Sequence, residues 1–506
     1  MVSISTSNFN PVMKKLHIRT ILLGVLMMGA CTSDFEEINT NPNSPTSVTP
    51  QLLLPQVMRD MMNSLMNETW GIGNIVVQHT AKNQFVNEDR YLWGELNSIW
   101  NAVYDNARDV NNIILIADEQ KLSNTKAVAL IVKSWMFSLA TDAYGDIPYD
   151  EASSAKAGIN YPVYDTQESI YQGILADLAE ANTLLASGTD AVTGDPIFKG
   201  SLIKWRKLAN SLRIRYLMRI SDRVNVGTQL SAILSDPTGN PIFEGNQDNG
   251  VYSYLASSPD QFPNYTQRIG SFNEFRASKT MVDWLQDRND PRVSIFFRPT
   301  PATENTPETS DDVIVGIPNG LGDVEAQEFN GGQQNQSRIG ALFYENAISA
   351  QGLNVAKGVI MTYAELNFLL AEAAEKNLIS ATAEDYYLEG IKASFDFYGV
   401  DPGAGYYAQA EVAYTGTQQE KLVKIGEQKW ASLYYQGLEA WFDWRRTNIP
   451  VLVPSVTNQN SNRIPVRFIY PIIEQALNGT NRAAAVGRQG SDDLNSRVWW
   501  DVNANN

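Results

Sequence analysis

The stretch "QESIYQGILADLAEANTLL" (residues 167–185) indicates the fold class, because its apolar residues recur every three or four positions. This spacing places one apolar face on an amphipathic helix. The face consists of Ile170, Ile174, Leu178, Ala181 and Leu185. A second stretch, "SLIKWRKLANSLRIRYLMRI" (residues 201–220), repeats the pattern after a short gap, with Ser201 as the expected N-cap. Its face consists of Leu202, Trp205, Ala209, Leu212 and Tyr216.

Helical periodicity extends over much of the chain. Further helices are expected at 95–118, 123–140, 277–288, 361–376, 382–398 and 419–436. The helix at 361–376 has an apolar face that could meet the helix at 382–398. Paired helices of this length predict a mostly α fold built from tetratricopeptide-like helix pairs, although no clean repeat consensus is present.

Two long stretches do not fit helices. Residues 236–276 and 290–360 contain many Gly, Pro, Asn and Gln residues. Loops of this length are uncommon in a compact domain unless they have a function. We therefore expect an irregular, loop-rich face on the helical scaffold. No linker divides the chain, so residues 51–506 are predicted to form a single domain.

The chain has one cysteine, Cys31, among 506 residues. This count excludes an internal disulfide framework and a cysteine-based zinc site. A cysteine nucleophile needs a basic partner, usually histidine, and only His17 and His79 are present. Since His17 lies in an apparent targeting segment, a Cys–His enzyme is not expected. His79 alone is interpreted as a structural, hydrogen-bonded histidine.

The residues before Cys31 form an export signal. Residues 1–30 contain three basic residues and no acidic one, and a short apolar run ends at Gly29 and Ala30. "VLMMGACTSDFEE" (residues 25–37) resembles the lipobox of bacterial lipoproteins, with Cys31 as the lipidated residue. The alternative is an ordinary secretory signal with a chance cysteine. The polar residues 31–50 are predicted to be a flexible tether.

Charge limits the partners of the chain. The formal net charge is −17, and loss of residues 1–30 would change it to −20. Such a protein is a poor electrostatic partner for nucleic acid or anionic lipid head groups. Membrane attachment is therefore expected to depend on the lipid anchor at Cys31. The acidic residues that follow the cysteine resemble signals that direct some lipoproteins to the cell surface.

Enzyme motifs are sparse. The sequence has no HExxH, P-loop or GxSxG motif. The fragment Gly71-Ile72-Gly73 lacks the rest of a nucleotide-binding fingerprint and is interpreted as a turn. No metal or cofactor is predicted. Paired carboxylates of a glycosidase could exist among 56 acidic residues, but the sequence does not identify such a pair.

Aromatic residues in loop-like sequence are the candidate ligand-binding residues. Aromatic rings pack against the CH faces of sugars, while amides and arginine supply orienting hydrogen bonds. The candidates are Trp70, Tyr91, Trp93, Tyr252, Tyr254, Phe262, Tyr265, Arg268 and Phe272. The alternative, that these rings hold the loops onto the helical core, remains open.

Several phrases, in this order, resemble the SusD/RagB-like outer-membrane lipoproteins. They are "TDAYGDIPYDEA" (141–152), "SKTMVDWLQDRNDPR" (278–292), "KWASLYYQGLEAWFDWRRTNIP" (429–450), "IPVRFIYP" (464–471) and "RVWWDVN" (497–503). The resemblance covers nearly the whole mature chain and implies an α-helical scaffold with a loop-rich face. It also implies a non-enzymatic lid on the outer surface of the outer membrane. Such a lid captures oligosaccharide, or in some members peptide, for a SusC-type TonB-dependent transporter.

Two other functions stay open beside this one. The chain could be an all-helical hydrolase acting on glycans, or a protein-interaction scaffold that binds no small ligand. The resemblance transfers only the lipidation role of Cys31, because the binding loops of the family differ greatly among its members.

Overall fold

The structure is a computed structural model that describes residues 49–255, 257–265, 271–304, 311–340, 343, 357–454 and 457–502. The predicted signal segment, Cys31 and nearly all of the tether lie outside the described residues, as does Arg268. Residues Pro50–Asn506 form one compact unit. All structural statements below concern the described residues of this unit.

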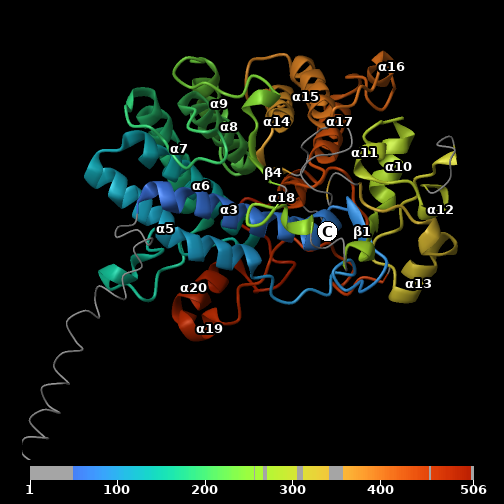
Figure 1. The fold of residues 1–506 in the computed structure, drawn as a ribbon, viewed down its shortest axis with the longest axis horizontal. Coiled ribbons are helices and arrows are strands. Elements are labelled where there is room, and N and C mark those ends of the chain that lie inside the picture. The colour runs from blue at the N-terminus through green and yellow to red at the C-terminus, as the bar shows by residue number, and fades with distance from the viewer. Residues whose placement is uncertain are drawn as a thin grey trace, which may run out of the picture. The chain divides into compact units, whose positions relative to one another are not determined.

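Helices dominate the unit, which confirms the predicted fold class (Figure 1). The longer helices are α3 (Pro50–Glu68), α5 (Ser98–Gln120), α6 (Ser123–Tyr144), α7 (Gln167–Ser187), α8 (Leu202–Ile220), α14 (Tyr363–Glu375), α15 (Ala383–Tyr398) and α17 (Gln418–Ser432). Helices of intermediate length are α9 (Gly227–Leu234), α10 (Lys279–Asp287), α18 (Gly437–Thr447) and α20 (Gly479–Gln489). Short helices are α4 (Asn74–Val76), α11 (Val293–Phe296), α12 (Pro301–Glu304), α13 (Asp323–Glu328), α16 (Ala404–Tyr407) and α19 (Glu474–Leu477).

Helix α7 forms as its sequence predicts. Thr166 caps it by accepting a hydrogen bond from the Ser169 N–H, and the five apolar residues of the predicted face are all buried. Helix α8 also buries its predicted face, apart from the half-buried Leu202. Ser201 occupies the N-cap position of α8, as predicted, but its side chain makes no capping hydrogen bond there.

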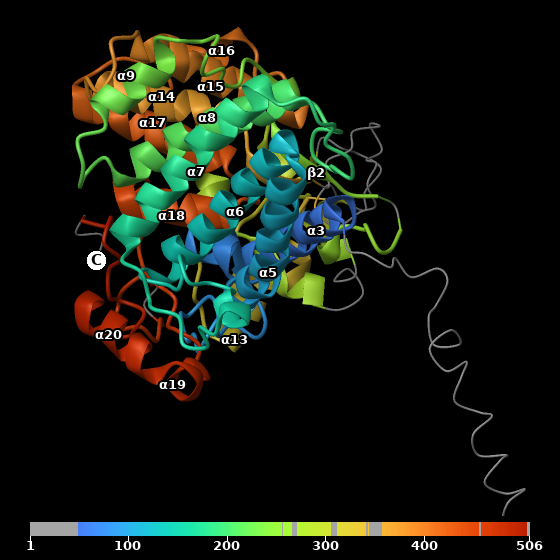
Figure 2. The same ribbon diagram turned by 90° about the vertical axis from the view of Figure 1, so that its left-hand side faces the viewer.

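Consecutive helices pack against each other through these faces. α5, α6, α7 and α8 follow one another in space, and α14, α15 and α17 continue the series (Figures 1 and 2). The predicted contact between the helix at 361–376 and the next one is present as the α14–α15 pair. The apolar core is continuous from α3 to the C-terminal residues of the unit.

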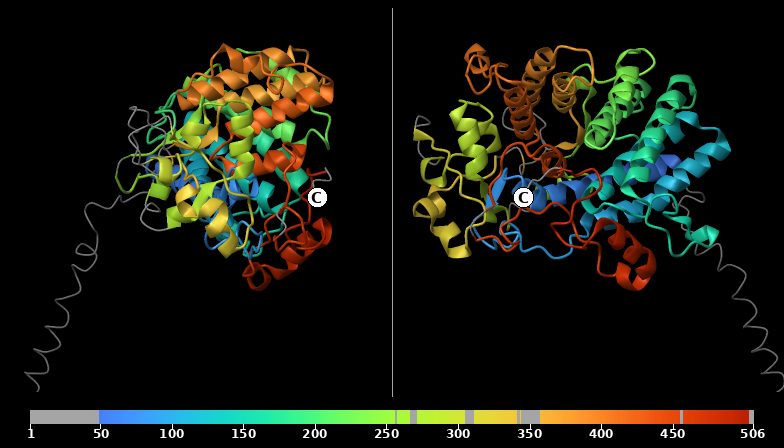
Figure 3. Two further views of the ribbon diagram at one scale, coloured as in Figure 1. Left: turned by 90° about the vertical axis from the view of Figure 1, so that its right-hand side faces the viewer. Right: turned by 180° about the vertical axis from the view of Figure 1, so that it is seen from behind.

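Strands are few and short. β1 (Thr80–Lys82) pairs antiparallel with β3 (Phe275–Ala277), and β2 (Gly250–Ser253) pairs antiparallel with β4 (Lys357–Met361). β1 and the helices α10 to α13 lie together at one end of the unit, as Figure 1 shows by label and Figure 3 shows for the yellow helices. We call this end the loop face; it contains much of the sequence predicted to be irregular.

Two local predictions are corrected by the structure. Gly71-Ile72-Gly73 is not a turn but part of a π-helical segment, η1 (Thr69–Gly73), which continues α3 into α4. The helix expected at 419–436 ends at Ser432, and Tyr435 has a positive φ of 63° in the link to α18. Helix α3, which has a Met-rich buried face, was not among the predicted helices.

Candidate functional site

Four predicted aromatic residues come together beneath the loop face. Ring centroids lie 5.0 Å apart for Tyr252 and Tyr254, and 5.2 Å apart for Tyr254 and Phe262. Tyr435 joins Phe262 at 6.1 Å to Trp70 at 6.0 Å. These distances suit edge-to-face and tilted packing of aromatic rings. The sequence missed Tyr435, because it lies in a stretch that reads as continuous helix.

The same residues are almost closed off from solvent. Trp70 is 5% exposed, and Tyr252, Tyr254 and Phe262 are buried as well. Trp70 also contacts Phe275 of β3, with 4.3 Å between centroids. In this arrangement the rings pack the loops onto the helices, as the alternative interpretation held. Their role in ligand binding stays a prediction.

The other candidates do not belong to this group of rings. Tyr91 is buried, and the half-buried Trp93 packs edge-on against Trp441 at 6.4 Å while its Nε1 donates to the Glu88 carbonyl. Tyr265 is half-buried against the core. Arg268 and the side chain of Phe272 lie outside the described residues.

Phe85 is an exposed aromatic residue on the loop face. Its side chain is 66% exposed, and its backbone has a φ of 50°. A bulky residue in the left-handed region is uncommon and strained, and such outliers cluster at functional sites. Phe85 lies in the polar stretch "NQFVNED" (residues 83–89), between the candidates Trp70 and Tyr91, and an isolated aromatic residue in such a stretch was the available signal.

Hydrogen bonds hold the chain on both sides of Phe85. The Asn83 N–H donates to the Glu274 carbonyl at 2.9 Å. The Asn83 amide donates to Gln336 Oε1 at 3.1 Å, and the Val86 N–H donates to Asp323 Oδ1 at 3.4 Å. Loops distant in sequence therefore fix the backbone that presents the ring.

Charged groups lie in the strand and turn beside Phe85. Lys82 Nζ lies 2.9 Å from Glu88 and 3.5 Å from Glu274, and 5.2 Å above the Phe275 ring. The ammonium group thus lies between two carboxylates whose side chains remain partly exposed. These groups can accept or donate hydrogen bonds to a hydroxylated ligand.

Asp89 anchors the turn from beneath. Its carboxylate accepts hydrogen bonds from the Lys82 N–H at 3.1 Å and from Asn319 Nδ2 at 2.7 Å. Burial raises the pKa of Asp89 to about 6, although these hydrogen bonds and the nearby Lys82 charge oppose the shift. Asn319 also donates to the Thr80 carbonyl, so it ties β1 to the neighbouring loop.

A cavity of about 420 Å³ lies next to this turn and shares Asn319 with it. Its walls come from α10 and from the extended segment after α18, whose Val451 and Val453 side chains are largely exposed. Polar lining is supplied by Gln78, Lys279, Thr280 and Asp283. A volume in this range can hold part of a small saccharide.

Two negative findings apply to the described part of the chain. No helix there is both long enough and apolar enough to span a bilayer. The same residues contain no group of three or more His, Cys, Asp or Glu side chains arranged to hold a metal ion.

Comparison with known proteins gives a consistent assignment. A family model described as SusD-like, "Starch-binding associating with outer membrane", matches residues 42–471. A solved chitin-binding protein is 28% identical with a TM-score of 0.77, over 90% of this chain and 100% of its own. A SusD homolog from Bacteroides fragilis is 26% identical with a TM-score of 0.77, over 90% and 99%. No curated protein matches the chain.

A third solved structure is a chitin-binding SusD homolog from Flavobacterium johnsoniae. It is 25% identical with a TM-score of 0.74, and the alignment covers 89% of this chain and 99% of that one. Each similarity therefore spans nearly the whole helical unit, including the loop face.

Proposed function

This chain belongs to the SusD-like family of outer-membrane-associated proteins, and from that membership we propose that it is a lipoprotein that captures oligosaccharide at the cell surface. The observation with most weight is its likeness over about nine-tenths of the chain to two proteins described as chitin-binding. Chitin-type oligosaccharides are therefore the first ligands to test. A peptide ligand is the second candidate, since the resemblance to the SusD/RagB-like family also implies peptide capture by some members.

The proposed binding surface is the loop face around Phe85. An exposed ring on a fixed backbone can pack against the CH face of a sugar without losing much conformational entropy on binding. The partly exposed carboxylates beside Lys82 can accept hydrogen bonds from sugar hydroxyls. The predicted aromatics Trp70, Tyr252 and Phe262 would support this surface from beneath.

Binding without catalysis is part of the proposal. The alternative, a hydrolase acting on glycans, needs two carboxylates facing a bound glycosidic bond, with one of them protonated. Incubation with chitin oligosaccharides should therefore leave them chemically unchanged. A hydrolytic activity that co-purifies with the protein would support the hydrolase instead.

Attachment through Cys31 and delivery to a SusC-type TonB-dependent transporter complete the proposed function. Two or three acyl chains on one cysteine suffice for stable anchoring, since each buried CH₂ contributes about 0.8 kcal/mol. Cys31→Ser should release the protein from membranes with its ligand affinity intact. The release should be measured in cells that lack the transporter, because the transporter alone could retain the variant.

The decisive experiment is a calorimetric titration of residues 32–506 with chitin oligosaccharides. Phe85→Ala should weaken binding about tenfold or more, as for other exposed aromatic anchors. The control is Tyr161→Ala, which removes an aromatic side chain of similar exposure, 69%, away from the loop face. Equal affinities for wild type and Phe85→Ala would remove Phe85 from the site, and binding of no glycan or peptide would favour the pure interaction scaffold.

A further inference from the structure

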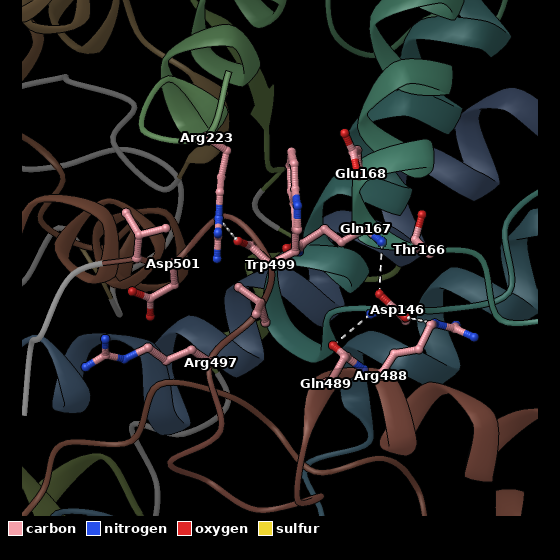
Figure 4. A pocket seen from close by; sticks show the side chains of 12 residues that line it. Asp146, Thr166, Gln167, Glu168, Arg223, Arg488, Gln489, Arg497, Trp499 and Asp501 are labelled. Carbon is pink, nitrogen blue, oxygen red and sulfur yellow. Dashed lines mark hydrogen bonds and ion pairs between the residues drawn. The ribbon is translucent and has the colours of Figure 1, made fainter. Parts of the chain in front are cut away.

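A second and larger cavity of about 640 Å³ lies apart from the loop face (Figure 4). Its lining comes from four parts of the sequence: Asp146, the first turn of α7, Arg223 after α8, and the C-terminal residues from Arg488 onward. It shares no lining residue with the cavity beside Asn319. The volume is sufficient for one or two sugar rings.

On one wall of this cavity, the polar side chains form hydrogen bonds with one another. The Asp146 carboxylate accepts from Arg488 Nε at 2.8 Å and from the Gln167 N–H at 2.9 Å. Gln489 Oε1 accepts from the Asp146 N–H at 3.0 Å. Asp146 therefore offsets the charge of Arg488, and this wall has a fixed geometry.

The opposite wall has two guanidinium groups that pair with no carboxylate of the described residues. Arg223 uses its Nε to donate to the Trp499 carbonyl at 2.5 Å, and its two terminal nitrogens have no hydrogen-bond partner among the described residues. Arg497 makes no hydrogen bond or ion pair with any described residue. This is unusual in a chain of net charge −17, in which acids far outnumber bases.

Glu168 and Asp501 also line the cavity, but among the described residues neither carboxylate forms an ion pair with Arg223 or Arg497. The Asp501 side chain is buried, and its charge helps to keep the buried Arg445 protonated. Glu168 lies in the first turn of α7, where the helix dipole stabilises its negative charge. In the view of Figure 4, the Trp499 ring stands between Arg223 and Glu168.

We propose that this cavity is a second saccharide site, specific for a sugar that has a carboxylate group. The guanidinium fork matches a planar carboxylate and forms charge-assisted hydrogen bonds with it. The half-buried Trp499 offers an aromatic surface for the sugar ring, and Glu168 can accept hydrogen bonds from its hydroxyls. The site goes beyond the proposed function, because it requires neither Phe85 nor any other residue of the loop face.

The test uses a matched pair of ligands, digalacturonate and digalactose. Each sugar ring of digalacturonate has a carboxylate where digalactose has a CH₂OH group. Residues 32–506 should bind digalacturonate at least about tenfold more tightly than digalactose in calorimetric titrations. Arg497→Gln and Arg223→Gln should each weaken digalacturonate binding about tenfold. Arg108→Gln, which removes the same charge from an exposed site on α5, should leave the affinity unchanged.

Several outcomes would overturn the proposal. The first is a failure of digalacturonate to bind, and the second is equal affinity for the two ligands. The third is a loss of digalacturonate affinity in Arg108→Gln as large as in the cavity variants, which would show that only the net charge of the protein matters. Unchanged thermal unfolding midpoints exclude misfolding of the two cavity variants. Phe85→Ala should leave digalacturonate binding intact, and Arg497→Gln should leave chitin-oligosaccharide binding intact, so failure of one site is distinguishable from failure of the other.

Discussion

Gly73 and Gly437 bring two helical backbones into direct contact. A Cβ atom on Gly437 would lie 2.2 Å from the carbonyl carbon of Gly73, and one on Gly73 would lie 2.8 Å from the Leu438 nitrogen. No other residue type fits either position unless the backbone moves. This contact fixes η1 against the first turn of α18, and it thereby positions Trp70, which lies in η1.

Gly437→Ala should destabilise the protein by about 1–3 kcal/mol, the usual cost of overpacking, because the added methyl group meets backbone rather than a movable side chain. Gly71→Ala is the matched control, since the same π-helical segment has open space at that position. Urea unfolding of both variants gives the comparison. A Gly437→Ala variant as stable as Gly71→Ala would contradict the close contact.

Arg446 and Glu372 form a buried ion pair between α18 and α14. Each terminal nitrogen of the guanidinium donates to one carboxylate oxygen at 2.5 Å. Burial alone would raise the pKa of Glu372, but the charges of Arg446, Lys376 and Lys429 outweigh burial and hold this pKa well below its usual range. Lys429 and Arg446 also share Asp443, at 2.7 and 2.9 Å.

Glu372→Gln should lower the free energy of unfolding by about 3–5 kcal/mol, because Asp443 alone would then face the two buried cations Arg446 and Lys429, and one buried charge would lack compensation. The control is Asp396→Asn, which breaks the exposed Lys392–Asp396 pair and should cost less than about 1 kcal/mol. Chemical denaturation at pH 7 measures both. Similar losses in the two variants would mean that burial adds nothing to the Glu372 pair.

His79 should make stability depend on pH. Its ring is fully buried, and Nε2 donates to the Trp430 carbonyl at 3.0 Å. Burial lowers the pKa of His79 to about 3, although this hydrogen bond opposes the shift. The unfolded chain binds a proton below about pH 6.5, whereas the folded protein does not. The contribution of His79 to stability is therefore complete above pH 6.5 and is lost as the pH falls toward 3.

Between pH 6 and pH 4, His79→Gln should remove about 1.4 kcal/mol per pH unit from the slope of unfolding free energy against pH. The carboxylates contribute equally to wild type and variant, so the difference between the two curves isolates the histidine. Denaturant titrations at several pH values give both slopes. Parallel curves over this range would show that His79 is protonated in the fold.

Trp70→Ala should primarily destabilise the protein rather than only weaken ligand binding. A buried Trp replaced by Ala typically costs about 3–5 kcal/mol, because a cavity remains. Trp70→Phe retains most of the contact with Phe275 and should cost less. Thermal unfolding followed by binding measurements well below the midpoint separates the two effects. Full stability of Trp70→Ala together with lost binding would restore Trp70 as a ligand contact.

The helices were predictable because their signal is local. The apolar spacing that begins at Ile170 defines a buried face whichever element packs on it, and each of the eight helices expected from this spacing is present. The errors lie at positions where local sequence permits two structures. Gly71-Ile72-Gly73 could be a turn or a helix, and only the contact with α18 selects the π-helical form.

The aromatic residues were also predictable only in part. The sequence identified a group of rings in irregular segments, but it could not separate the buried Trp70 from the exposed Phe85, since burial depends on distant chain segments. Asp323 and Gln336 lie more than 200 residues from the turn that they fix. The cavity lined by Arg223 and Arg497 is likewise assembled from parts of the chain that are remote in sequence.

The sequence alone thus determined the helical fold class, the pairing of α14 with α15 and the resemblance to an outer-membrane binding family, because periodic patterns and ordered phrases are properties of neighbouring residues. The tertiary structure decided which aromatic ring faces solvent and which arginines have no carboxylate partner within the described part of the chain. These are properties of contacts between segments hundreds of residues apart, such as Arg223 with Trp499, and no local pattern encodes them.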